Sequence, residues 1–125
     1  MAEILDRIAG EYLLRDDWMR AKPYSDASWS LFRELDLLEK PEAFPAYQRR
    51  GVILCHAGEV AEGLVLLHQA ENFIYRFKPL PTQNLVSVQT ALWNACEVIG
   101  DLEEAKKYEN LSKQTLHFLK KTNET

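Results

Sequence analysis

Apolar residues recur three and four positions apart along the chain, which is the spacing of one face of an α-helix rather than of a strand. Ile4, Ile8 and Tyr12 mark a first helix from about residue 2 to 14, and a second apolar face follows over 18–35. Later runs predict a helix that ends at Ala57-Gly58, one from Glu59 to about Phe77, one that ends at Ile99-Gly100, and one that reaches about Lys120. The pattern predicts an all-α fold.

Local signals refine the helix boundaries. Pro23 lies inside the second apolar face, where a proline removes a hydrogen bond and clashes with the preceding turn. We therefore expect a kink or short break there, with Ser25 capping the helix that resumes. Asp101 followed by Glu104 resembles a capping box at the start of the last helix. Residues 121–125 carry no apolar side chain and are expected to fray.

Similar residues recur at a constant spacing of 42 positions. Four columns share it: Ala9, Gly51 and Trp93; Asp17, Glu59 and Asp101; Ala21, Gly63 and Ala105; and Ser28, Ala70 and Ser112. A fixed period in this range is typical of repeat proteins, in which stacked units bury one continuous core. We expect a single domain over 1–125, with repeats at about 1–42, 43–84 and 85–125. A non-repetitive six-helix domain would have the same composition.

The small residues at the predicted helix crossings and the turns at Gly58-Glu59 and Gly100-Asp101 resemble the tetratricopeptide repeat family. The period exceeds the common 34 residues, so the chain is similar to the longer-helix members, kinesin light chains and bacterial Rap-type regulators. The resemblance implies three antiparallel helix pairs stacked as a short right-handed superhelix. Trp93 departs from the family pattern, because small residues are usual at its position, and so does Pro23.

Composition narrows the possible partners. Hydrophobic residues make up 46% and charged residues 27%, which is ordinary for a globular protein. The net charge of −4, without a stripe of Lys and Arg, argues against nucleic acid. The apolar runs are shorter than the roughly 20 residues that cross a bilayer. Glu3 and Asp6 also lie where a secretory signal would carry positive charge. We expect a cytoplasmic protein that does not bind membranes.

Nothing in the sequence indicates catalysis. The chain has 3 histidines but no His-x-x-x-His pair, no Cys-x-x-Cys and no glycine-rich phosphate loop. Cys55 and His56 are adjacent, so on a helix their side chains point about 100° apart and cannot act as nucleophile and base. Cys55 and Cys96 are expected to be small apolar core residues rather than a disulfide. We predict no enzyme activity, no cofactor and no metal site.

By the family resemblance, the first helix of each repeat lines a concave groove. The side chains it would place there are Asp6, Gly10 and Leu13, then Gln48, Val52 and Cys55 or His56, then Thr90, Asn94 and Glu97, with Arg49 on the rim. Asp6 stands where family members that clamp a terminal carboxylate have a lysine, so that ligand is not expected. The mixed lining favours an extended or helical peptide segment. A solvated helix face would explain each of these residues equally well.

Three functions fit these observations. The first is a non-catalytic module that binds a protein or peptide partner in the groove. The second is a peptide-sensing regulator of the Rap type, although the three repeats take up the whole chain and leave no room for an effector part. The third is self-association into a homo-oligomer, suggested by apolar residues on more than one face: Phe32, Leu35, Leu37, Leu38, Leu116, Phe118 and Leu119.

Overall fold

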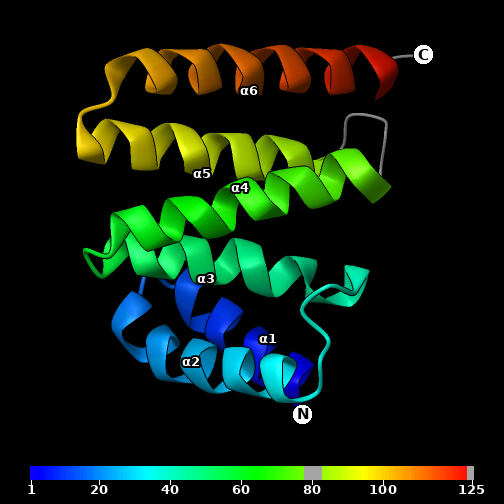
Figure 1. Cartoon of the computed structure of the whole chain (residues 1–125). Helices are drawn as coiled ribbons and strands as arrows, with labels where there is room; N and C mark the ends of the chain where they lie inside the picture. The colour runs from blue at the N-terminus through cyan, green and yellow to red at the C-terminus, as the bar shows by residue number, and fades with distance from the viewer. Residues whose placement is uncertain (78–82, 124–125) are drawn as a thin grey trace. The chain divides into compact units, whose positions relative to one another are not determined.

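The computed structural model describes residues 1–77 and 83–123, and every regular element within them is helical (Figure 1). The elements are α1 (Ala2–Leu14), α2 (Trp18–Glu34), the 3₁₀ helix η1 (Pro41–Ala43), α3 (Phe44–His56), α4 (Val60–Phe77), α5 (Gln83–Ile99) and α6 (Leu102–Asn123). The all-α prediction is confirmed. The chain forms two compact units, Met1–Leu66 and Leu67–Thr125, with the boundary inside α4.

The turns after α1, α3 and α5 share one backbone geometry. Each has a left-handed residue just past the helix: Asp16 at φ 60°, Gly58 at φ 89° and Gly100 at φ 82°. The amide that follows each of these residues donates back to a carbonyl five residues earlier, over 2.9, 2.8 and 3.0 Å respectively. This bond satisfies a carbonyl that the helix end leaves free. The predicted turns are confirmed, and they recur at the 42-residue spacing.

Aspartates start two of the helices that follow these turns. The Asp17 carboxylate accepts from the amide of Arg20 at the start of α2, over 3.2 Å. The Asp101 carboxylate accepts from the amide of Glu104 at the start of α6, also over 3.2 Å. Each bond satisfies a free amide of the first helical turn. The predicted cap at Asp101 is therefore confirmed.

The predicted break at Pro23 is wrong, because α2 runs from Trp18 to Glu34 without interruption. Pro23 removes one amide, whose partner would be the carbonyl of Met19, and Met19 lies on the exposed side of the helix where water can take that carbonyl. Ser25 does not cap a helix. It is buried, and its Oγ accepts a hydrogen bond of 3.2 Å from Arg50 of α3.

The last helix is longer than predicted. Residues 121–123, expected to fray, belong to α6, which ends at Asn123. Lys120 and Lys121 lie in its last turn, where positive charge interacts favourably with the negative end of the helix dipole. The remaining two residues of the predicted tail, 124–125, lie outside the described residues.

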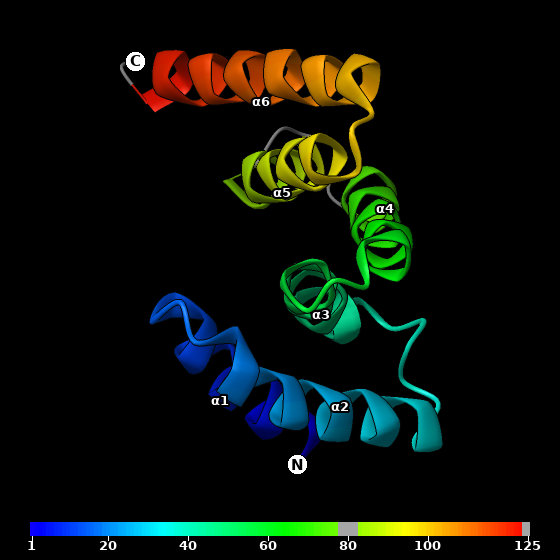
Figure 2. The same cartoon turned by 90° about the vertical axis from the view of Figure 1, so that its left-hand side faces the viewer.

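The first unit is built on α1, α2 and α3, which pack against one another (Figure 2). Its centre contains Ala9, Ala21 and Ile53, all fully buried, one from each helix. Two alanines among three central residues let the helix backbones approach closely. The Ser28 hydroxyl donates over 2.8 Å to the carbonyl of Ala2. This bond links the second half of α2 to the start of α1.

A glycine sets the crossing of α3 with the start of α4. A Cβ atom at Gly63 would lie 2.7 Å from the carbonyl oxygen of Gly51 and 2.6 Å from Sγ of Cys55. Both distances are shorter than van der Waals contact, so only glycine fits here. The predicted close approach at these two glycines is confirmed.

The second unit contains the rest of α4 with α5 and α6, and α5 packs along α6. Its apolar core includes Val88, Leu92 and Ala105, each almost fully buried. Trp93, the departure from the repeat pattern, is half-buried, and its indole N–H donates over 2.7 Å to Glu97.

We predict that Gly63→Ala lowers the free energy of unfolding by about 1–3 kcal/mol, the usual effect of overpacking a core. On an unhindered helix the same substitution would stabilise the protein by about 0.8–1 kcal/mol, so the sign of the effect is diagnostic. Urea unfolding measures it. Removing Sγ with Cys55→Ala leaves the clash with the Gly51 carbonyl, so Gly63→Ala should still destabilise that variant. Stabilisation in either protein would show that the crossing has room.

Candidate functional site

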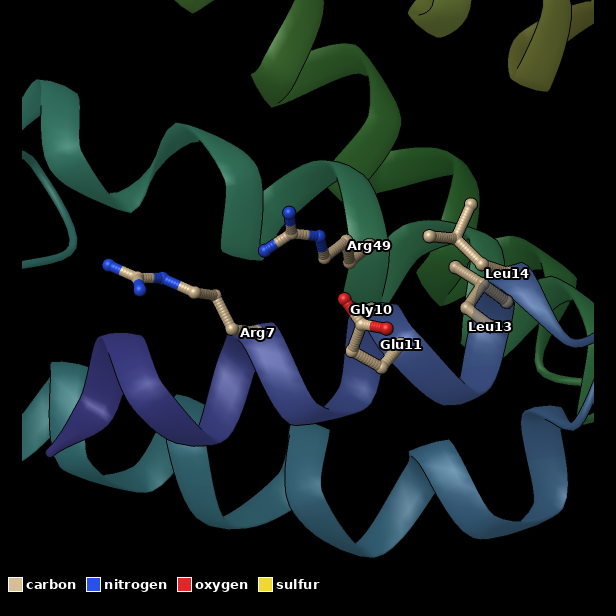
Figure 3. Close-up of a pocket in the computed structure, with 6 residues that line it drawn as sticks. All are labelled: Arg7, Gly10, Glu11, Leu13, Leu14 and Arg49. Atoms are coloured by element: carbon tan, nitrogen blue, oxygen red, sulfur yellow. The ribbon is translucent and has the colours of Figure 1, made fainter.

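The first unit carries a hollow of about 350 Å³ on the side of α1 that faces α3 (Figure 3). Its lining consists of Arg7, Gly10, Glu11, Leu13 and Leu14 of α1 and Arg49 of α3. Pockets of about 300–1,000 Å³ accommodate small ligands or a few inserted side chains. The hollow is therefore the candidate functional site of the first unit.

Arg49, which lines this hollow, forms an ion pair with a buried carboxylate. The Arg49 guanidinium donates to the Asp6 carboxylate, whose side chain is only 8% exposed. The Arg49 side chain passes over Gly10 to reach Asp6. A Cβ atom added at Gly10 would lie 2.8 Å from Arg49 Nε. Gly10 thus provides the space through which Arg49 reaches α1. The Arg49 side chain remains 35% exposed and can still donate to a ligand.

Two opposing effects act on the Asp6 carboxyl. Burial raises its pKa, while the charge and the hydrogen bond of Arg49 lower it, and the pKa remains above its ordinary value. The cost of removing the carboxylate from water is thus only partly offset by its partner. The Asp6 carboxyl is the acidic partner that the structure gives Arg49.

The next residue, Arg50, has a structural role on a different side of α3. Its guanidinium donates to Asp26 over 2.7 Å and to Ser25 over 3.2 Å, and it lies 5.6 Å from the ring centre of Trp29. Burial raises the pKa of Asp26, but the hydrogen bonds and charges of Arg50 and Lys22 outweigh this and hold it below its ordinary value. Arg50 therefore ties α3 to α2, as Arg49 ties α3 to α1.

Two charged residues of the lining form no ion pair with any residue that the structure describes. Within residues 1–77 and 83–123, no acidic side chain pairs with Arg7 and no basic side chain pairs with Glu11, and both are exposed. Leu14 ends the row with 84% of its surface exposed. A helix end that presents free charges beside an exposed leucine offers both polar and apolar contacts to another molecule.

The structure brings together four of the residues expected in the groove: Asp6, Gly10, Leu13 and Arg49. Asp6 forms the buried ion pair and does not line the hollow. The other residues of α3 that were expected are Gln48, Val52 and Cys55 or His56. Gln48, Val52 and Cys55 are half-buried, and His56 is exposed at the end of that helix.

The remaining expected residues belong to α5 in the second unit. Thr90 is half-buried, whereas Asn94 and Glu97 are exposed, and Glu97 accepts the hydrogen bond from Trp93. The hollow itself involves only residues of the first unit. The groove assignment of these three residues stays a prediction.

Sequence reasoning missed three lining residues, Arg7, Glu11 and Leu14. They lie four and three residues apart, so they follow one stripe of α1. The signal was present, because Leu14 is a large apolar residue next to the polar break at residues 15–17. The groove positions that the family resemblance implies, Asp6, Gly10 and Leu13, lie on a neighbouring stripe of α1.

Elsewhere, one cluster of ionisable groups lies inside the second unit. The Tyr108 hydroxyl donates to Glu71 over 3.2 Å and lies 3.4 Å from Nδ1 of His68. Burial, followed by the charge of Glu71, raises the pKa of Tyr108 far above its ordinary value. The phenol therefore stays protonated and acts as a hydrogen-bond donor. Its geometry is that of a structural link between α4 and α6.

The chemistry of the described residues is otherwise limited. Within that part of the chain, no three His, Cys, Asp or Glu side chains come close enough to share a metal ion. Of the helices described there, none combines the length and apolar character needed to cross a bilayer. The hollow is one place in the described residues where a ligand would meet both charged and apolar groups.

We predict that Gly10→Ala lowers stability by about 1 kcal/mol in the wild-type protein, because the new methyl group displaces Arg49 from Asp6. In a protein that already carries Asp6→Asn and Arg49→Ala, the same substitution should stabilise by about 0.5–1 kcal/mol, as alanine does inside a helix. Urea unfolding of the four proteins gives both numbers. Equal effects in the two backgrounds would mean that Gly10 is not needed for the ion pair.

The raised pKa of Asp6 also predicts a pH dependence. The folded protein holds this proton more tightly than the unfolded chain, whose pKa is near 3.8, so ionisation of Asp6 destabilises the fold. Its contribution should be fully present below about pH 3.8 and be lost as the pH rises through the folded pKa. The measurement is the difference in unfolding free energy between wild type and Asp6→Asn from pH 3 to 7. A difference that grows in favour of wild type with rising pH would show that Arg49 outweighs burial.

Comparison with the models of known families, with curated proteins and with solved structures finds no match for this chain. What the hollow does must therefore be argued from its own side chains. Those side chains combine a neutralised arginine, a free arginine, a free glutamate and two leucines. This combination is the basis of the proposals below.

Proposed function

We propose that this protein is a non-catalytic interaction module that binds a segment of a partner protein on the side of α1 that faces α3. The observation that carries the proposal is the hollow beside Arg49, whose lining offers free charges and exposed apolar surface at one place. Partner-binding sites commonly combine an apolar anchor with a few fixed polar groups. The proposal makes no use of catalysis, metal or cofactor.

The arginine of the hollow is well suited to binding. Asp6 and Gly10 together hold Arg49 in one conformation, so a ligand that contacts it does not have to order it. Ordering a long side chain on binding would otherwise cost about 0.5–1.5 kcal/mol. Covering an exposed leucine such as Leu14 contributes about 1.5–3 kcal/mol when burial is complete.

The repeat pattern supports the choice of this face. The turns after α1, α3 and α5 share their geometry at the 42-residue spacing. Small residues of the columns, such as Ala21, Gly63 and Ala105, are buried. These facts support a tetratricopeptide-like arrangement, in which the first helix of each pair would line the concave side of a short right-handed superhelix. Under this proposal α1 and α3 are such first helices.

Capture of partners from the source cells tests the proposal, with Arg7→Glu/Leu14→Asp as the variant. Arg33→Glu/Met19→Asp is the control, because both of its residues are exposed on α2, neither belongs to the apolar set suggested for self-association, and the changes in charge are the same. We expect the first variant to lose its partner at least tenfold, or about 1.4 kcal/mol of binding free energy, while the control retains it. Urea unfolding establishes that both variants fold.

Equal recovery of partners by the two variants would show that the side of α1 that faces α3 is not the binding site. Recovery of this chain itself as the captured protein would instead favour self-association. Sedimentation equilibrium of the purified protein then gives the number of copies.

A further inference from the structure

We propose that the exposed face of α1 is a self-association surface, on which a second copy of this chain packs its own α1 in the antiparallel direction. Four residues form this surface, the α1 stripe: Ile4, Arg7, Glu11 and Leu14. The inference goes beyond the proposed function, because its partner is a second copy of the chain and not a different protein.

The α1 stripe lies on one side of the helix and is open to contact. Its residues are three, four and three positions apart, so at about 100° per residue they fall within about 80° of arc. Ile4 is 53% and Leu14 84% exposed, and the two charged residues between them are exposed as well. Helices that pair with one another present residues at this alternating spacing of three and four. The stripe therefore has the geometry of one side of a helix pair.

The order of residues in the α1 stripe is complementary to itself. Ile4 and Leu14 lie five positions on either side of residue 9. Arg7 and Glu11 lie two positions on either side of it. A two-fold axis at the level of residue 9 would therefore place Ile4 of one copy opposite Leu14 of the other. The same axis places Arg7 opposite Glu11, and each contact forms twice, as two-fold symmetry requires.

The two charges of the stripe are suited to pairing with a second copy. Among residues 1–77 and 83–123, Arg7 forms no ion pair with an acidic side chain and Glu11 none with a basic one. Within one copy, a basic residue four positions before an acidic one is the less favourable order on a helix. Figure 3 shows the Arg7 side chain directed away from Glu11. Since no ion pair holds it there, it can turn across to Glu11 of the second copy.

The same charges determine the direction of the second copy. In a parallel pair, Arg7 would meet Arg7 and Glu11 would meet Glu11, and like charges repel. The antiparallel arrangement turns both of these contacts into attractions. At each end it also covers a largely exposed leucine, Leu14, with Ile4 of the other copy.

The length of the α1 stripe limits the strength of the contact. From Ile4 to Leu14 there are ten steps along the helix, or about 15 Å. Two helices in contact over that length bury less than the roughly 1,200 Å² of a stable interface. We therefore expect a reversible dimer with a dissociation constant on the order of 100 μM.

The α1 stripe overlaps the hollow without being identical to it. Arg7, Glu11 and Leu14 belong to both, so a second copy would cover the lining that the proposed function assigns to a partner segment. At protein concentrations far below the dissociation constant of the dimer, the hollow is open. Ile4 belongs to the stripe and not to the lining, so a substitution there separates the two surfaces.

The test is sedimentation equilibrium of the purified whole chain at concentrations up to about 1 mM, tenfold above the expected dissociation constant. We expect a reversible monomer–dimer equilibrium, which Ile4→Asp weakens at least tenfold. Val65→Asp is the matched control, because Val65 of α4 is β-branched like Ile4 and 56% exposed. It should leave the equilibrium unchanged, and urea unfolding establishes that both variants fold.

Exchange of the charges tests the antiparallel direction. Arg7→Glu and Glu11→Arg should each weaken the dimer about tenfold, because each places like charges opposite one another at two symmetric positions. The chain with both substitutions should regain the wild-type affinity, since opposite charges then face each other again. Arg33→Glu, at an exposed position of α2, is the control and should leave the dimer unchanged.

A monomer mass at every concentration would overturn the inference, and so would a dimer that Ile4→Asp leaves intact. A double charge variant that dimerises as weakly as the single variants would overturn the antiparallel pairing. If the dimer fails but partner capture still depends on Arg7 and Leu14, the interaction module stands. If Ile4→Asp abolishes the dimer and partner capture does not depend on Arg7 and Leu14, the self-association surface stands without the proposed function.

Discussion

The first unit depends on an ion pair that forms only because α1 has no side chain at Gly10. Arg49 passes through that space to reach Asp6, and the next residue, Arg50, binds Asp26 on α2. Consecutive residues of a helix project about 100° apart, so two adjacent arginines leave α3 toward two different helices. A single stretch of α3 thereby fixes the positions of both α1 and α2, and the hollow lies where the first of these links crosses α1.

The same ion pair determines what the hollow presents to a ligand. Burying the Asp6 carboxylate is unfavourable, as its raised pKa indicates. The ion pair therefore adds less to stability than the direct contact between Asp6 and Arg49 suggests. The pair also places a carboxyl group beside one arginine of the lining and orients the part of that arginine that remains exposed. Among the described residues, Arg7 is then the arginine of the lining without an acidic partner.

Much of the fold could be predicted from the sequence, whereas the site could be predicted only in part. The helices and the turns at Gly58 and Gly100 follow from local patterns, because each depends on residues close together in the chain. The break at Pro23 was wrong since tertiary packing holds α2 together across it: Ala21, Ser25, Ser28 and Phe32 are buried along one face. The Asp6–Arg49 pair joins residues 43 positions apart, and no local pattern indicates such a contact. The sequence therefore predicts Asp6 and Arg49 as separate residues of a groove and not as an ion pair.

The 42-residue spacing separates the residues that build the fold from those that distinguish one repeat from the next. Positions that support the backbone keep their character, as at Ala21, Gly63 and Ala105, where each residue is small and buried. Other positions change in both residue type and burial: Gly10 is buried, Val52 half-buried and Asn94 exposed, while Arg7 is exposed and Arg49 and Ala91 are half-buried. Variation at these positions also changes helix contacts, because Arg49 reaches Asp6 through the space that Gly10 leaves on α1. The helices α1 and α3 thus share their turn geometry but not their side-chain contacts: Arg49 pairs with Asp6, whereas Arg7 has no acidic partner among the described residues.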